Sequence, residues 1–207
     1  MFKGNFDINL DFLKLKSPPL IGVDISSSSV KMVELSMIGK DNRAYRIERY
    51  VIESLPADAM QDGGIANMEA VTESLRRGWK RMGTRQKSVA LALPATDVIT
   101  KKSIVPAGQR EEDLVFQVEN EASQYIPFPL DEVDLDFQVT RSVPDNPEEV
   151  EVLIAASRKE KVEDRVAAAL AAGMKTVIVD VEPYCHRSRR QRPSPRGCTG
   201  QASSRIP

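Results

Sequence analysis

The chain has 207 residues, of which 41% are hydrophobic, 29% charged and 5% aromatic. These fractions are typical of a globular protein, and no apolar run is long enough to cross a bilayer. The net charge of −1 conceals a basic end, because residues 185–207 hold six arginines, both cysteines, the only histidine and no acid. The absence of thiol and imidazole from residues 1–184 argues against Cys/His metal sites and against Cys/His or Ser/His catalysis there.

Residues 1–19 are predicted to form an N-terminal arm. Phe6, Ile8, Leu10 and Phe12 alternate with polar residues, which is a strand-like period. The main prediction is a loosely held arm, with docking to a membrane or a partner as the alternative. The segment lacks the basic, apolar and small-residue order of a secretory signal, so the predicted location is the cytoplasm.

From Leu20 onward, a firmer pattern predicts a mixed sheet. Apolar segments joined by short polar turns predict three strands of an antiparallel meander, at residues 20–25, 30–36 and 45–53. A helix follows, with its apolar stripe at Val71, Leu75, Trp79 and Met82, and then a buried strand at residues 89–93. This order favours a mixed sheet that is covered by a helix.

Residues 95–140 are predicted to form an inserted small α+β module. It would contain a strand at residues 99–105, a helix at 110–125 and a half-buried strand at 133–139. The helix stripe is Leu114, Val118, Ala122 and Tyr125. After a polar turn at residues 144–147, the pattern predicts a strand at 150–155, a helix at 158–172 that Gly173 ends, and a strand at 176–181.

A serine-rich turn is the segment of the sequence best suited to chemistry. Asp24 ends a buried strand, four serines (Ser26, Ser27, Ser28 and Ser29) form the turn, and Lys31 follows in the next strand. Small residues let backbone N–H groups approach a phosphate, and an upstream acid can hold the water shell of magnesium. The alternative is an ordinary hairpin turn, since no Gly-Lys-Ser/Thr of a Walker loop is present.

Four segments of the chain resemble the PilM family of type IV pilus assembly proteins, within the superfamily of actin and FtsA. They are GVDISSSSVKMVEL (22–35), ENEASQYIPFPLDEVDLDF (119–137), EVLIAASRKEKV (151–162) and VDVEPY (179–184). The resemblance covers roughly residues 18–184 and implies an α/β, actin-like lobe of FtsA/PilM type. This lobe is a mixed sheet with covering helices and an inserted small α+β subdomain. Residues 20–94 and 150–184 would form subdomain 1A, and residues 95–149 would form subdomain 1C.

The resemblance also implies a nucleotide site. Its phosphate-binding residues would be Asp24, Ser26, Ser27, Ser28, Ser29 and Lys31, and Asp24 and Glu182 would hold magnesium-bound water. Glu182-Pro183 is explained equally well as an ordinary helix start. The family binds ATP and magnesium between two lobes, and the second lobe is expected to be missing here. The chain is therefore expected to bind neither tightly and not to act as an enzyme.

The family pattern breaks after Tyr184. Residues 185–207 contain Ile206 as their only aliphatic residue larger than alanine, and no apolar stripe is possible. They are predicted to be a disordered basic tail. The abrupt change in composition suggests that this tail is the out-of-frame end of a truncated reading frame. Nucleic-acid binding is the alternative for this tail, but it lacks the aromatic residues that stack on bases, so no nucleic-acid partner is expected.

The resemblance finally implies a partner. PilM proteins bind the N-terminal segment of the inner-membrane protein PilN between subdomains 1A and 1C. Tyr125, Ile126 and Phe128 are predicted to form part of that groove, with ordinary core packing as the alternative. The expected role is therefore a pilus assembly component at the cytoplasmic face of the inner membrane, held there only through its partner, with self-association also expected. The alternative function is an actin-like ATPase or an FtsA-like cell-division protein.

Overall fold

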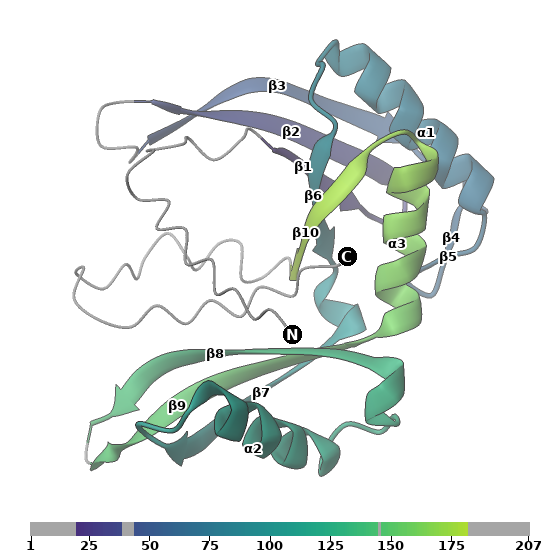
Figure 1. Ribbon diagram of the computed structural model, residues 1–207. Helices are drawn as coiled ribbons and strands as arrows, with labels where there is room; N and C mark the ends of the chain where they lie inside the picture. Colours follow the sequence, from purple (N-terminus) through teal and green to yellow (C-terminus); the bar gives the residue numbers. More distant parts are fainter. Residues whose placement is uncertain (1–19, 39–43, 145, 182–207) are drawn as a thin grey trace, which may run out of the picture.

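The computed structural model describes residues 20–38, 44–144 and 146–181, which form a five-stranded sheet, a three-stranded sheet, a two-stranded hairpin and three α-helices (Figure 1). The predicted N-terminal arm, Glu182 and the basic tail lie outside the described residues. The larger sheet occupies one end of the molecule and the smaller sheet the other, and α3 runs along the larger sheet toward the smaller one.

The larger sheet has five strands in the order β10-β6-β1-β2-β3. The neighbouring pairs β1–β2 and β2–β3 are antiparallel, which confirms the predicted meander, whereas β6 lies parallel to both β1 and β10. The strands are β1 (Ile21–Ile25), β2 (Ser29–Ile38), β3 (Ala44–Ser54), β6 (Ser88–Leu93) and β10 (Lys175–Val181). The short hairpin of β4 (Met60–Gln61) and β5 (Gly64–Ile65) lies between β3 and α1.

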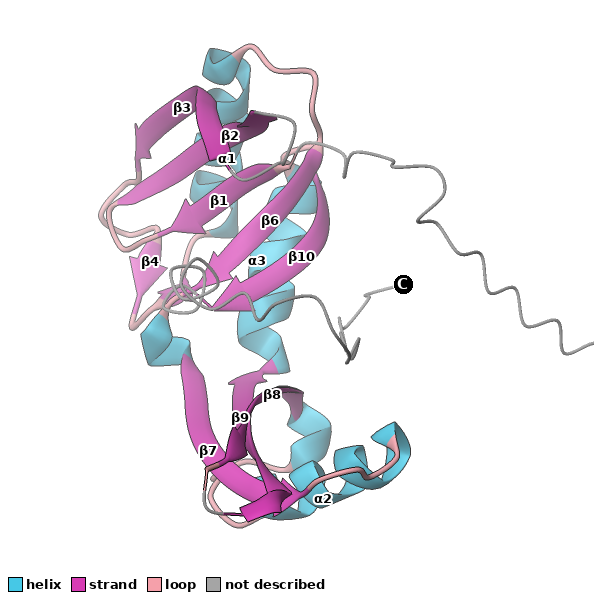
Figure 2. Ribbon diagram, turned by 90° about the vertical axis from the view of Figure 1, so that its left-hand side faces the viewer, coloured by secondary structure: helices cyan, strands magenta, loops and turns pink. Residues whose placement is uncertain are grey.

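Helices α1 (Met68–Met82) and α3 (Lys159–Ala171) cover one face of this sheet, and Figure 2 shows both behind the strands. The predicted stripe of α1 is buried at Val71, Leu75 and Met82 and half-buried at Trp79. Each large side chain that is fully buried contributes roughly 1.5–3 kcal/mol. A methyl group at Gly78 would lie 3.2 Å from Glu53 Cγ, so glycine at this position lets the helix approach the sheet closely.

Both ends of α1 carry a recognisable cap. The side chain of Asn67 accepts a hydrogen bond of 3.0 Å from the backbone N–H of Ala70, which satisfies one of the free donors of the first turn. At the other end Gly83 adopts a left-handed φ of 62°, and its N–H donates to the carbonyl of Lys80. These local signals and the apolar stripe together explain why this segment of the sequence is helical.

The smaller sheet has the order β7-β9-β8, and helix α2 packs on it. The elements are β7 (Val98–Pro106), α2 (Glu111–Ser123), β8 (Val133–Val143) and β9 (Asn146–Arg158), with short 3-10 turns η2 (Ala95–Asp97) and η3 (Leu130–Glu132). Val118 of α2 and Val152 and Ile154 of β9 form its core with Val105.

The smaller sheet corrects one predicted boundary. The resemblance placed the strand at residues 150–155 in subdomain 1A, with the larger sheet, but β9 pairs with β7 and β8. The chain passes from the smaller to the larger unit at Arg158, where β9 leads into α3. Alternation of apolar residues predicts that a strand is half-buried, and it does not say which sheet the strand joins.

Candidate functional site

The serine-rich turn connects β1 and β2. The hydroxyl of Ser26 donates a hydrogen bond of 2.8 Å to the carbonyl of Ser29, and the N–H of Ser26 donates to the same oxygen at 3.0 Å. The carbonyl of Ser28 accepts from the N–H of Leu55, which ties the turn to the end of β3. Ser26 and Ser29 therefore build the turn, while the side chains of Ser27 and Ser28 are exposed at its tip.

Asp24 and Lys31 face each other across the β1–β2 pair. Lys31 Nζ lies 2.8 Å from Asp24 Oδ2, in an ion pair that is half-exposed and therefore contributes little to stability. Asp180, which the sequence analysis missed, stands in the same row, because both Asp24 and Asp180 pair with Ala92 of the intervening strand β6. Two carboxylates thus flank Ala92 near the carboxyl ends of three parallel strands.

The turn fits one side of a nucleotide site. Lys31 and the hydroxyls of Ser27 and Ser28 are suitable phosphate ligands, and Asp24 is suitable for magnesium-bound water. Glu182, the second acid predicted for that role, lies outside the described residues. Within the residues that the structure describes, no group of three or more Cys, His, Asp or Glu side chains is placed to hold a metal ion.

A pocket of about 160 Å³, the junction pocket, lies between the smaller sheet, η2 and the first turn of α3, the helix that covers the larger sheet. Ile126 and Phe128, both predicted for the partner groove, line this pocket together with residues of η2, β7, β8, β9 and α3. The other lining residues are Thr96, Asp97, Ile99, Val133, Ala156, Ser157, Arg158 and Lys161. The guanidinium of Arg158 lies 5.3 Å from the ring centre of Phe128. The pocket therefore has an apolar wall and two cations.

Tyr125 does not line this pocket. It continues the stripe of α2 and packs against the core of the smaller sheet, with Lys101 Nζ 4.3 Å from its ring centre. Burial, and secondly the negative charge of Glu121, raises the pKa of its phenol. The core-packing alternative therefore describes Tyr125 in this structure, whereas the chain turns after α2 and sends Ile126 and Phe128 to the pocket.

An ion pair that sequence reasoning missed holds the pocket together. Arg165 of α3 and Asp97 of η2 lie 2.9 Å apart, with side chains that are only 1% and 6% exposed. Arg165 also donates to the carbonyl of Gly63 at 2.8 Å, and Ser157 donates to the carbonyl of Asp97 at 2.9 Å. One signal was available in the sequence: Arg165 lies at helical spacing from the buried Val162 and Ala169, where a lone cation requires a buried partner.

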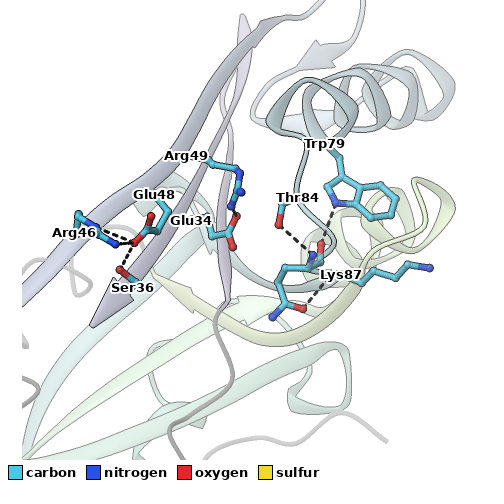
Figure 3. Close-up of polar contacts among 9 residues, drawn as sticks. Glu34, Ser36, Arg46, Glu48, Arg49, Trp79, Thr84 and Lys87 are labelled. Carbon is cyan, nitrogen blue, oxygen red and sulfur yellow. Dashed lines mark hydrogen bonds and ion pairs between the residues drawn. The ribbon is translucent and has the colours of Figure 1, made fainter. Parts of the chain in front are cut away.

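A wider, polar hollow of about 490 Å³ lies between β2, β3 and the end of α1 (Figure 3). Its polar groups bind one another: Arg49 donates to Glu34 at 3.0 Å, and the indole N–H of Trp79 donates to the carbonyl of Gln86 at 2.9 Å. None of the predicted site residues that the structure describes lines this hollow. Its size reflects an open surface between paired side chains, so we place the candidate site at the junction pocket.

Comparison with known proteins agrees with this architecture. The family model described as "Type IV pilus assembly protein PilM" matches residues 22–195, which extends beyond Tyr184, where the family pattern was expected to break. A solved structure titled "PilM-PilN type IV pilus biogenesis complex" matches with 29% identity and a TM-score of 0.70. The match covers 80% of this chain and 48% of that chain, so the chain spans about half the length of this relative.

A second structure resembles the chain in fold alone. It is the cytoplasmic domain of EpsL, an inner membrane component of the type II secretion system of Vibrio cholerae. It is 14% identical with a TM-score of 0.50, and the match covers 79% of this chain and 57% of that one. The predicted actin-like fold is confirmed. No helix in the described ranges is long and apolar enough to span a membrane. The chain belongs to the PilM family of type IV pilus assembly proteins.

Proposed function

We propose that this chain acts in type IV pilus assembly by binding the N-terminal segment of a PilN-type partner in the junction pocket. One observation carries the proposal: the pocket has an apolar wall formed by Ile99, Ile126, Phe128 and Val133 at the meeting point of the two units. The similar solved structure is a PilM-PilN complex, which favours this kind of partner over an FtsA-like role in cell division.

The structure also supports an extended conformation for the bound segment. Strands β7 and β8 are the two edges of the smaller sheet, and Ile99 and Val133, near their ends, line the pocket. An edge strand offers free backbone groups along which an extended peptide can pair, while its apolar side chains enter a neighbouring pocket. We propose that the peptide combines these two contacts and holds the chain at the cytoplasmic face of the inner membrane.

The first experiment replaces Phe128 with alanine. Because Phe128 lines the pocket, Phe128→Ala is expected to weaken binding of a PilN N-terminal peptide by about 1–3 kcal/mol, measured by fluorescence anisotropy. The matched control is Phe116→Ala, which removes a ring that is 67% exposed on α2 and lies outside the pocket. This control should leave the affinity unchanged.

Thermal melting of the same variants separates binding from folding. Phe128 is 36% exposed, so its removal should lower the melting temperature only slightly if the ring serves the peptide. A large loss of stability, or equal loss of affinity in the Phe128 and Phe116 variants, would contradict the proposed role.

We propose a second and weaker activity for the serine-rich turn, the binding of phosphate groups. The observation in its favour is that Ser27 and Ser28 are exposed at the tip of the turn and that Lys31 follows them in β2. If this chain binds the family's ATP and magnesium, the turn would contact them from one side. We propose no catalytic step for the described residues. The test is a nucleotide titration, given below.

A further inference from the structure

The two faces of the five-stranded sheet differ in what covers them. Toward α1 and α3, the side chains of Val23, Met32, Val51 and Leu91 are no more than 6% exposed. On the opposite face, which is turned toward the viewer in Figure 2, no helix within the described residues covers the strands. This face is nevertheless apolar over β2 and β3.

Five large side chains form an apolar sheet patch on the open face. On β3, Val51 and Glu53 are buried toward α1, so the alternating Tyr50 and Ile52 point the other way and are 74% and 58% exposed. Leu35, Tyr45 and Ile47, at 38%, 44% and 62% exposure, continue the patch toward the far end of the strands. A contiguous patch of this kind on a sheet is typical of a surface that another segment covers.

The patch reaches the place where the N-terminal arm joins the sheet. The first residue of β1, Ile21, pairs with Glu34, so residues 35–38 of β2 extend beyond β1 and pair only with β3. Leu35 and Ile47, which are register partners, lie in this extension. The chain that precedes Leu20 therefore starts next to the patch.

We propose that residues 6–12 of this chain cover the apolar sheet patch. Their sequence alternates Phe6, Ile8, Leu10 and Phe12 with Asp7, Asn9 and Asp11, so in an extended conformation they present one apolar side and one polar side. The intervening residues 13–20 can span up to about 28 Å when extended, which reaches across the patch from its near edge.

Two further features of the sequence select this segment and this surface. Pro18 and Pro19 lack an N–H, so neither can donate a ladder hydrogen bond to β2. The basic residues 185–207 contain Ile206 as their only aliphatic residue larger than alanine, so they cannot supply an apolar side. Residues 6–12, by contrast, carry the alternating apolar side chains that the patch requires.

Cysteine cross-linking of the full chain tests the contact. In a Cys185→Ser, Cys198→Ser background, Leu10→Cys is combined with Ile47→Cys on the patch. The matched control combines Leu10→Cys with Val139→Cys, an exposed position on the smaller sheet. We expect an intrachain disulfide to form about tenfold faster in the first pair, because docking raises the effective concentration of the two thiols. Equal rates would overturn the proposal.

Mixing chains of two different masses identifies the occupant. If the disulfide of the first pair joins a light chain to a heavy one, a second copy covers the patch and the proposal is wrong. A complementary measurement uses Ile8→Asp/Leu10→Asp, which should release the arm and increase the fluorescence of an apolar dye severalfold. Asp7→Asn/Asp11→Asn, on the polar side of the arm, should leave the fluorescence unchanged. A larger increase in fluorescence with Asp7→Asn/Asp11→Asn than with Ile8→Asp/Leu10→Asp would contradict the proposal.

Discussion

The serine-rich turn and the junction pocket differ in how many parts of the fold build them. The turn comes from one hairpin, and its exposed groups, Ser27 and Ser28, face water. The pocket draws on both units, because η2, α3 and strands β7, β8 and β9 all contribute to it. A buried ion pair between Asp97 and Arg165 joins two of these elements, η2 and α3. The described residues therefore contain a pocket built from several elements and a turn built from one hairpin; we propose the first as the site for an apolar segment and the second as one side of a nucleotide site.

The largest expected effect is the loss of stability when the buried ion pair beside the pocket is broken. Arg165→Met should lower the free energy of unfolding by about 3–5 kcal/mol, because it leaves the Asp97 carboxylate buried without its cation. Chemical denaturation measures this loss, and the double variant Asp97→Leu/Arg165→Met should recover part of it. The control, Arg110→Met, removes an exposed ion pair with Asp113 and should cost less than about 1 kcal/mol. Similar losses for Arg165→Met and Arg110→Met would show that the buried pair does not hold the junction.

The second prediction concerns the turn. Attraction between charges is weak where water has access, so we expect no ATP binding tighter than about millimolar, or roughly −4 kcal/mol. Lys31→Ala should weaken even this binding, as measured by the chemical-shift changes that ATP induces at Ser27 and Ser28. A micromolar, magnesium-dependent ATP site, measured by calorimetry, would contradict the proposal that the turn supplies only one side of a nucleotide site.

The smallest expected effect lies on the smaller sheet, away from both sites. The side-chain hydrogen bond from Lys102, followed by those from Thr140 and Arg141, lowers the pKa of Glu151 from 4.5 to about 2. A lowered folded-state pKa means that ionised Glu151 stabilises the fold above pH 4.5 and that this contribution is lost as the pH falls toward 2.

Carbon-detected NMR titration should place the midpoint of Glu151 near 2. The difference in free energy of unfolding between the wild-type chain and Glu151→Gln should shrink over the same pH range. The matched control on β9 is Glu149→Gln. A midpoint at the ordinary value of 4.5 would show that the three hydrogen bonds are not maintained in solution.

Local patterns predicted the elements better than their assembly. The stripe of Val71, Leu75 and Met82 identified α1, because a helix with one buried face repeats its apolar residues every three or four positions. The placement of residues 150–155 with the larger sheet, which the resemblance implied, was wrong, because β9 pairs with β7 and β8. Asp97 and Arg165 are 68 residues apart, and their contact depends on the packing of α3 against η2. No local pattern records such a distance.

The candidate site shows the same limit. The sequence singled out Tyr125, Ile126 and Phe128 together for the partner groove, and their environments in the structure differ. Tyr125 continues the helical stripe into the small core, and Ile126 and Phe128 line the pocket. The direction of each side chain depends on where α2 ends, which is a matter of one or two residues.

The most direct test of the central claim is a titration of the chain with a peptide of the partner's N-terminal segment. If the junction pocket is formed within the described residues, the peptide should bind saturably with a dissociation constant below about one millimolar, or better than roughly −4 kcal/mol. A scrambled peptide of the same composition should not bind, and Phe128→Ala should weaken the binding while Phe116→Ala does not. A folded wild-type chain that ignores the peptide up to millimolar concentration would contradict the claim.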